Sequence, residues 1–179
     1  MNQFVVAEDG RVYEASVRAT VTTLKEYFPE IDATSIEANI LLERSHRLLQ
    51  GQRESYWAKY GLTGQRFVLL RLLYTSPGKR LSMGEIASAM HQGMNNVTQL
   101  VGGLVKDGLA ERMSAEDDKR VVYAVLTSKG GEMFAAAFPA NAQRIEAAWS
   151  TLTESERKLL IHLLSRLRLH LLAGEATFE

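Results

Sequence analysis

The sequence predicts a mainly α-helical (α+β) protein with one projecting β-hairpin, which is the outline of a winged helix. Two short strand candidates, Leu109–Met113 and Val121–Val125, are separated by a polar loop at Ser114–Lys119. Two such strands joined by a charged loop predict a β-hairpin. The segments on both sides have the apolar spacing of amphipathic helices. Because a lone hairpin is barely stable in water, we expect it to pack on a helical core.

Composition favours one globular domain with additions and excludes several kinds of site. Of the 179 residues, 46% are apolar, which suits a buried core. Cysteine is absent, so disulfides, thiolate metal sites and thiol redox sensing are excluded. Four histidines without a zinc-binding spacing give no metal signature, and we expect neither a metal nor a cofactor. No segment looks long and apolar enough to span a membrane, and no signal peptide precedes Arg11, so we expect a cytoplasmic protein.

The charge balance restricts how the chain could bind a polyanion. The 21 basic and 21 acidic residues cancel, which does not favour a nucleic-acid binder on composition alone. A DNA-binding face would have to be a local basic surface. An enzyme is not expected, because no nucleophile–base motif, Gly-rich phosphate loop or metal spacing is present.

Residues 1–34 form an N-terminal extension in which we expect one extra helix after a frayed start at Met1–Gly10. The helix is expected over Arg11–Phe28 and is ended by Pro29. Its apolar stripe has the 4-3-4 spacing of one helix face: Val17, Val21, Leu24 and Phe28. Because the stripe is apolar and the helix is not basic, covering the body or the dimer is favoured over a regulatory arm.

Two helices are expected next. A long helix over Ser35–Tyr60 ends at Gly61, a residue type preferred after a helix. Thr63 then starts a helix over Gly64–Thr75, and the apolar width of that helix predicts deep burial.

A helix-turn-helix is predicted after the turn at Ser76–Gly78. Ser82 and Glu85 have the spacing of a capping box and open a short helix. A break at His91–Gly93 separates it from a second helix over Met94–Lys106. Two short helices joined by a tight turn predict this motif, whose second helix would enter the major groove.

Two further helices are expected after the hairpin. Thr127 can cap a helix that runs towards Trp149, and we expect Pro139 to kink or interrupt it. Thr153 and Glu156 form another capping-box pattern. The helix that follows has leucines at 3-4 spacing: Leu160, Leu163, Leu164, Leu167 and Leu171. So many leucines favour packing against a partner chain, although burial within the monomer stays open.

A more specific pattern lies across the hairpin. Asp118-x-Arg120 is followed after five residues by Leu126-Thr127 and after two more by Gly130. This pattern resembles the wing signature of the MarR family of bacterial transcription regulators. The resemblance extends over roughly residues 36–172. It implies a winged helix-turn-helix over 62–127 and dimerisation helices over 35–61 and 128–179, with the first and last helices of two subunits interlocked.

The second helix of the motif supplies the candidate base-reading residues. Amide side chains can bond adenine bidentately, and a threonine can contact a thymine methyl group or a phosphate. We therefore assign the following candidates for DNA contact: Gln92, Asn95, Asn96, Thr98, Gln99 and Lys106. The helix departs from the family pattern, which usually has arginine near the positions of Gln99 and Gly103. Gly102 and Gly103 also weaken the helix, by about 1 kcal/mol each relative to Ala.

The wing supplies basic side chains. Lys119 and Arg120 can reach phosphates or a narrow minor groove, and Arg112 is a further phosphate candidate. Asp118 cannot itself favour a polyanion. The family resemblance implies that it holds the arginine in position through an ion pair.

The resemblance implies a ligand-responsive homodimer, expected to be a repressor, that binds an inverted repeat in double-stranded DNA. The alternative is a winged-helix module for protein–protein interaction, which the neutral charge and the paired glycines would suit. The effector is expected to be a small aromatic or apolar anion, because MarR-like proteins often bind phenolic carboxylates between the first long helix and the winged-helix body. Candidate ligand residues combine cations and aromatic rings on the two helices at that junction: Arg44, His46, Arg47, Trp57, Phe67 and Tyr74.

Overall fold

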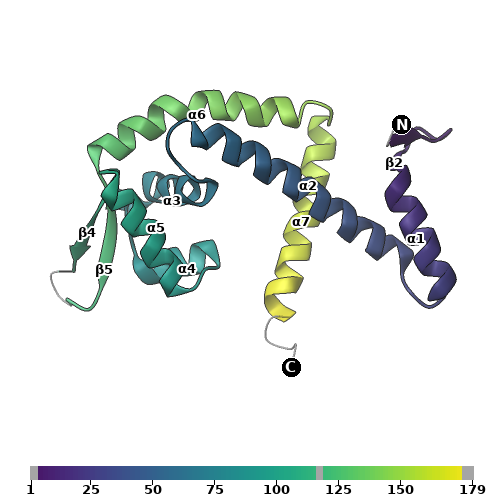
Figure 1. Cartoon of the computed structure of the whole chain (residues 1–179), viewed down its shortest axis with the longest axis horizontal. Coiled ribbons are helices and arrows are strands. Elements are labelled where there is room, and N and C mark those ends of the chain that lie inside the picture. The colour runs from purple at the N-terminus through teal and green to yellow at the C-terminus, as the bar shows by residue number, and fades with distance from the viewer. Residues whose placement is uncertain (1–3, 116–118, 175–179) are drawn as a thin grey trace.

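The computed structural model describes residues 4–115 and 119–174, and this part contains seven α-helices and five short strands (Figure 1). In chain order the elements are β1 Phe4–Val6, β2 Val12–Glu14, α1 Ala15–Tyr27, α2 Ala33–Ala58, α3 Gly64–Thr75, β3 Arg80–Ser82, α4 Met83–Met90, α5 Met94–Lys106, β4 Ala110–Ser114, β5 Val122–Leu126, α6 Ser128–Ala148 and α7 Glu154–Gly174. A short 3₁₀ turn, Pro77–Lys79, joins α3 to β3.

The winged-helix body consists of α3, α4, α5 and an antiparallel sheet in the order β3-β5-β4. The predicted hairpin is confirmed, with Arg112 opposite Ala124 in the register of β4 and β5. Strand β3, which pairs with β5 on its other edge, was not expected. It gives the hairpin the third strand that an isolated pair needs for stability.

The core of the body is apolar and fully enclosed. The helices contribute side chains that are 0% exposed: Leu69, Leu70, Leu73, Ile86, Val97, Val101 and Leu104. From β5, Ala124 is equally buried, so the wing is packed on the helices by its base. This arrangement fixes the position of α5 and of the wing relative to one another.

Side-chain caps place the helix starts where the sequence predicted them. The Thr63 hydroxyl accepts from the backbone N–H of Arg66 at 3.2 Å and starts α3. Ser82 and Glu85 form a complete capping box at α4. Such a cap satisfies amide groups that have no partner inside the helix, and its loss costs about 1 kcal/mol.

Gly130 allows α6 to start directly against the body. Thr127 accepts from the Gly130 N–H at 3.1 Å and donates to the carbonyl oxygen of Gly108 at 2.8 Å. A Cβ on Gly130 would collide with the backbone carbonyl oxygen of Leu109. Only glycine permits this approach, which explains a residue that the wing pattern contains.

Helix α6 continues through Pro139 without interruption and bows over the body (Figure 1). Of the two effects predicted for Pro139, a kink or an interruption, the interruption is therefore wrong. Bending of a helix at proline follows from the lost backbone hydrogen bond and the bulk of the ring.

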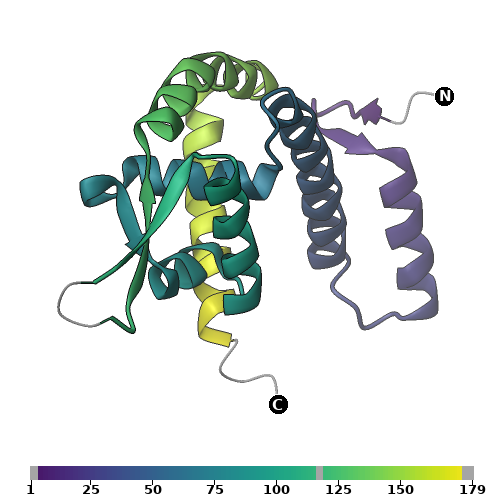
Figure 2. The same cartoon turned by 60° about the vertical axis from the view of Figure 1, so that its left-hand side comes forward.

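The N-terminal extension differs from the expected frayed start. Phe4–Val6 pairs with Val12–Glu14 in a small antiparallel hairpin, and α1 begins only at Ala15. Helix α1 lies along α2, and the predicted stripe is partly confirmed because Val17 and Val21 are buried. Figure 2 shows this pair of helices standing apart from the winged-helix body.

Candidate DNA-binding surface

Helix α5 presents a polar face to solvent and an apolar face to the core. Val97, Val101 and Leu104 are fully buried, whereas Asn95, Asn96, Thr98, Gln99 and Lys106 are exposed. The Asn96 amide donates to the Gln92 side-chain oxygen at 3.0 Å, which ties the turn to the first turn of the helix. Amide side chains in this setting can donate to and accept from base edges.

The turn of the helix-turn-helix is set by His91. Its backbone is left-handed, with φ 49° and ψ 49°, and its N–H donates to the carbonyl oxygen of Ser88 at 3.2 Å. Gly93 has an ordinary extended φ of −67° and serves as the N-cap of α5. The left-handed position of the turn is thus occupied by His91, although glycine is the residue type that adopts this conformation most easily and Gly93 lies only two residues away.

Arginines from two other elements lie against the paired glycines of α5. Arg112 on β4 donates from Nη2 to the carbonyl oxygen of Thr98 at 3.0 Å, and the same nitrogen would lie 3.6 Å from a Cβ on Gly102. The guanidinium of Arg66 on α3 lies against Gly103, where a Cβ would collide with it.

Arg66 also forms an ion pair with Asp107, with Nη1 3.2 Å from Oδ2. Two guanidinium groups therefore flank α5 although the helix itself carries none. Sequence reasoning missed Arg66, because no local pattern places a side chain of α3 against a glycine 37 positions later.

The wing is formed by the antiparallel pair β4 and β5. The N–H of Ala115 donates to the carbonyl oxygen of Val121 at 2.9 Å and extends the hairpin beyond the strands. Lys119 and Arg120 are exposed. Asp118 lies outside the described residues, so its predicted pairing with the arginine stays a prediction. Lys119 and Arg120 thus lie outside the strands, whereas the third basic residue of the wing, Arg112, lies on β4.

The six candidate ligand residues lie in two regions, three on the exposed surface of α2 and three in one aromatic cluster of the core. Arg44 bonds to Glu14 of the N-terminal extension, while His46 and Arg47 are exposed along the middle of α2. Trp57 and Phe67 are buried and stacked at a centroid distance of 3.9 Å. Tyr74 packs on Phe134, with ring centroids 4.5 Å apart. The structure does not bring these side chains together around one hollow.

No group of three or more His, Cys, Asp or Glu side chains in the described part of the chain could hold a metal ion. Across residues 4–115 and 119–174, no helix is both long and apolar enough to cross a membrane.

A helix-turn-helix with exposed amide side chains on its second helix, followed by a basic wing, defines a winged-helix DNA-binding protein. The profile of the MarR family matches residues 60–121. The chain is 28% identical over 147 residues to the transcriptional repressor YetL of Bacillus subtilis, covering 82% of this chain and 88% of the relative. It is 36% identical over 112 residues to the regulator YkoM of the same organism, covering 63% and 71%.

Solved structures agree with this assignment. The structure of AbsC, a MarR family regulator from Streptomyces coelicolor, matches with a TM-score of 0.75 and 25% identity, covering 80% of this chain and 97% of AbsC. Sco3205 from the same organism, solved in complex with DNA, has the same fold with a TM-score of 0.73 at 24% identity, covering 77% and 88%. The chain belongs to the MarR family. It is a transcription regulator and not an enzyme.

Proposed function

We propose that this regulator is a homodimeric repressor that binds an inverted repeat, with α5 of each subunit in the major groove and the wing in the minor groove. The observation that carries the proposal is the exposed polar face of α5, which is held rigidly between the His91 turn and the wing. YetL, a relative of this chain, is a transcriptional repressor, which supports the direction of regulation. A protein that binds the bacterial chromosome would act in the cytoplasm.

The dimer is supported by α7. No described residue of this helix is buried, and its leucines include Leu163 and Leu167, which are about half exposed. Apolar stripes of this length are normally covered. A two-fold dimer would place two copies of α5 in successive major grooves, about one helical turn of DNA apart.

Individual residues are assigned roles by their chemistry. Gln92, Asn95, Asn96 and Gln99 are proposed to read bases, and Thr98 a thymine methyl group or a phosphate. Basic residues are proposed to contact phosphates or the minor groove: Lys106, Arg112, Lys119 and Arg120. Asp118 is proposed to position Arg120.

Fluorescence anisotropy with the DNA upstream of the protein's own gene tests this proposal. Gln99→Ala should weaken binding to the preferred site by about 1–3 kcal/mol and leave random DNA unchanged. Lys106→Ala should weaken both DNAs and lower the salt dependence of binding. Equal losses on both DNAs for Gln99→Ala would show that this residue does not read a base.

The wing has a test whose sign is informative. Arg120→Ala should weaken DNA binding and reduce its salt dependence. Asp118→Ala removes a negative charge, so simple electrostatics predicts tighter binding, whereas a positioning role predicts weaker binding. Tighter binding would refute the positioning role.

We also propose that an effector, a small aromatic or apolar anion, controls the dimer geometry. Arg44 and Arg47 are three residues apart on α2 and could together hold a carboxylate if Arg44 exchanged Glu14 for the ligand. A second location is a hollow of about 560 Å³ between α2 and α6, lined by Tyr56, Lys59 and Arg144 among others. An effector can shift the dimer only through different affinities for its two geometries.

A thermal-shift and gel-shift screen with salicylate-like acids distinguishes the two locations. A bound effector should raise the melting temperature and release DNA. Loss of the response in Arg44→Ala and Arg47→Ala would favour the first location, and its loss in Arg144→Ala would favour the second. No response to aromatic acids at millimolar concentration would contradict the proposed effector class.

A further inference from the structure

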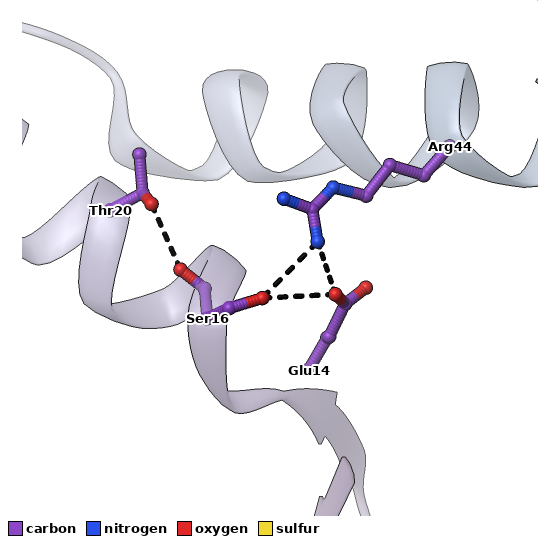
Figure 3. Close-up of polar contacts among 4 residues, drawn as sticks. All are labelled: Glu14, Ser16, Thr20 and Arg44. Atoms are coloured by element: carbon purple, nitrogen blue, oxygen red, sulfur yellow. Dashed lines mark hydrogen bonds and ion pairs between the residues drawn. The ribbon is translucent and has the colours of Figure 1, made fainter. Parts of the chain in front are cut away.

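The N-terminal extension is fixed to α2 at a defined position. Arg44 on α2 reaches the carboxylate of Glu14 and the hydroxyl of Ser16, the latter at 3.1 Å (Figure 3). Beside this polar contact, Val17 and Val21 of α1 are buried where α1 packs along α2. The extension therefore forms part of the fold and cannot move freely along α2.

The hairpin of the extension has an apolar face that stays largely uncovered among residues 4–115 and 119–174. Phe4 pairs with Glu14 and Val6 pairs with Val12, and directly paired residues project to the same side of a sheet. Because Glu14 contacts α2, this side is turned towards α2. Phe4, Val6 and Val12, which we call the hairpin face, are nevertheless 57%, 68% and 64% exposed.

Helix α2 has an exposed leucine on the side that faces the extension. Leu48 follows Arg44 by one helical turn and so lies on the same side of α2, where it is 72% exposed. Two-stranded hairpins are barely stable in water, and exposed apolar side chains on neighbouring elements mark an interaction site. A partner element is therefore expected beside the hairpin and α2 together.

Helix α7 has the surface and the charge that such a site would take. Besides its leucine stripe, a second side of α7 carries exposed apolar residues, among them Ile161, Leu169 and Leu172. Helix α7 contains four arginines or lysines and two glutamates, both in its first turn, whereas residues 4–32 contain six acidic and three basic residues. Opposite charges on two surfaces favour their association and fix their orientation.

We propose that the hairpin face of one subunit covers the second apolar side of α7 of a second copy of the chain. The α7 of the same chain does not fill this position, since Phe4, Val6 and Val12 stay exposed within one chain, and Figure 2 shows α2 between α7 and the extension. The inference rests on the homodimer proposed above and adds a second layer to its interface. In the first layer the leucine stripe of α7 packs against the partner chain. In the second layer the hairpin face of the partner covers the other apolar side of α7.

Site-directed cross-linking tests the contact directly, since the native chain has no cysteine. Full-length Val6→Cys and full-length Ile161→Cys are mixed, allowed to exchange subunits and treated with a short bismaleimide. The mixture should yield a covalent dimer on a reducing gel. Ala19→Cys, placed on the exposed side of α1 away from α2, should give little product with Ile161→Cys. A dimer of native mass that forms no Val6–Ile161 product would overturn the inference.

A dilution series measured by sedimentation gives a second, independent readout. Phe4→Asp combined with Val6→Asp should raise the dimer dissociation constant at least about tenfold, because two charges would face the apolar side of α7. Ala19→Asp adds the same kind of charge to the extension and should leave the constant unchanged.

The outcomes separate the two proposals. If the double variant has the same dimer dissociation constant as the native chain, the contact between the hairpin face and α7 is contradicted, but the proposed homodimer is not. A wild-type chain that remains a monomer at micromolar concentration contradicts both.

Discussion

The winged-helix body and the outer helices bury their apolar residues to very different extents. In the body, Leu70, Leu73 and Leu104 are fully buried. Among the described residues, α7 buries none and α2 buries only Trp57, next to its junction with the body. Most of a helix's stability comes from packing its apolar face. The body is therefore complete within one chain, whereas the outer helices present half of an interface.

The largest effect is expected where the outer helices meet a second copy. Leu163→Asp combined with Leu167→Asp should convert the dimer into a monomer at micromolar concentration, because each leucine contributes about 1.5–3 kcal/mol when buried and a buried unpaired charge adds a further cost. Sedimentation measures the mass. Arg166→Asp, at an exposed position outside both apolar sides of the same helix, is the matched control. A stable dimer of the double variant would assign the stripe to burial inside the monomer instead.

A core substitution in the body should behave differently. Leu104→Ala should lower the free energy of unfolding by about 2–5 kcal/mol through lost burial and the cavity that remains. Denaturant titration of the monomeric α7 variant, with and without Leu104→Ala, isolates this loss. The midpoint of that variant should not depend on protein concentration, whereas the midpoint of the native dimer should. Concentration dependence in the monomeric variant would mean that the body is incomplete on its own.

Two neighbouring glycines at the start of α6 test how closely this helix must approach the winged-helix body. Gly130→Ala should cost about 1–3 kcal/mol, because its Cβ would collide with the Leu109 carbonyl oxygen. For Gly131→Ala the nearest atom is a side-chain carbon of Leu126 at 3.8 Å, so the variant should be neutral or gain up to about 1 kcal/mol. Thermal unfolding of both variants makes the comparison. Equal melting temperatures would show that α6 can move away from the body cheaply.

The smallest expected effect on stability comes from two capping boxes, one at the start of α4 in the body and one at the start of α7. Hydrogen bonds from the Thr153 hydroxyl and N–H hold the pKa of Glu156 in α7 below its ordinary value of 4.5. The N–H and hydroxyl of Ser82 similarly lower the pKa of Glu85 in α4. A lowered folded-state pKa stabilises the fold above the ordinary pKa, and this contribution is lost as pH falls through the folded-state value.

Carboxyl NMR titration of the native chain, of Thr153→Ala and of Ser82→Ala checks this prediction. Each substitution should return only the pKa of its own glutamate towards the ordinary value. A shift of both pKa values by one substitution would show that the two helix starts are coupled.

Sequence patterns predicted the local structure of the body accurately, because caps and apolar spacing act over a few residues. The helices over Gly64–Thr75 and Met94–Lys106 have the predicted bounds. Strand β3 was not predicted, because three residues are too few to show a periodic pattern. Its strand conformation depends on pairing with β5. The N-terminal hairpin was missed for the same reason.

The candidate sites show where local reasoning stops. The exposed polar face of α5 follows from helical spacing, and the structure places Asn95, Asn96 and Gln99 on it. By contrast, the pairing of Arg44 with Glu14 and the stacking of Trp57 on Phe67 join residues that are distant in sequence. The candidate ligand residues were chosen because cationic and aromatic side chains could bind an aromatic anion. Only the tertiary structure shows the partners that these groups already have.

The two glycines of α5 have a consequence for anyone who wishes to redesign its specificity. Their surfaces are occupied by Arg112 from β4 and Arg66 from α3, so part of what the helix presents is encoded elsewhere in the chain. A transplanted α5 would arrive in a foreign scaffold without these guanidinium groups and with two weak helical positions exposed. The transferable unit is therefore a composite of three segments, and operator preference should move between scaffolds only when Arg66, Asp107 and Arg112 are moved with the helix.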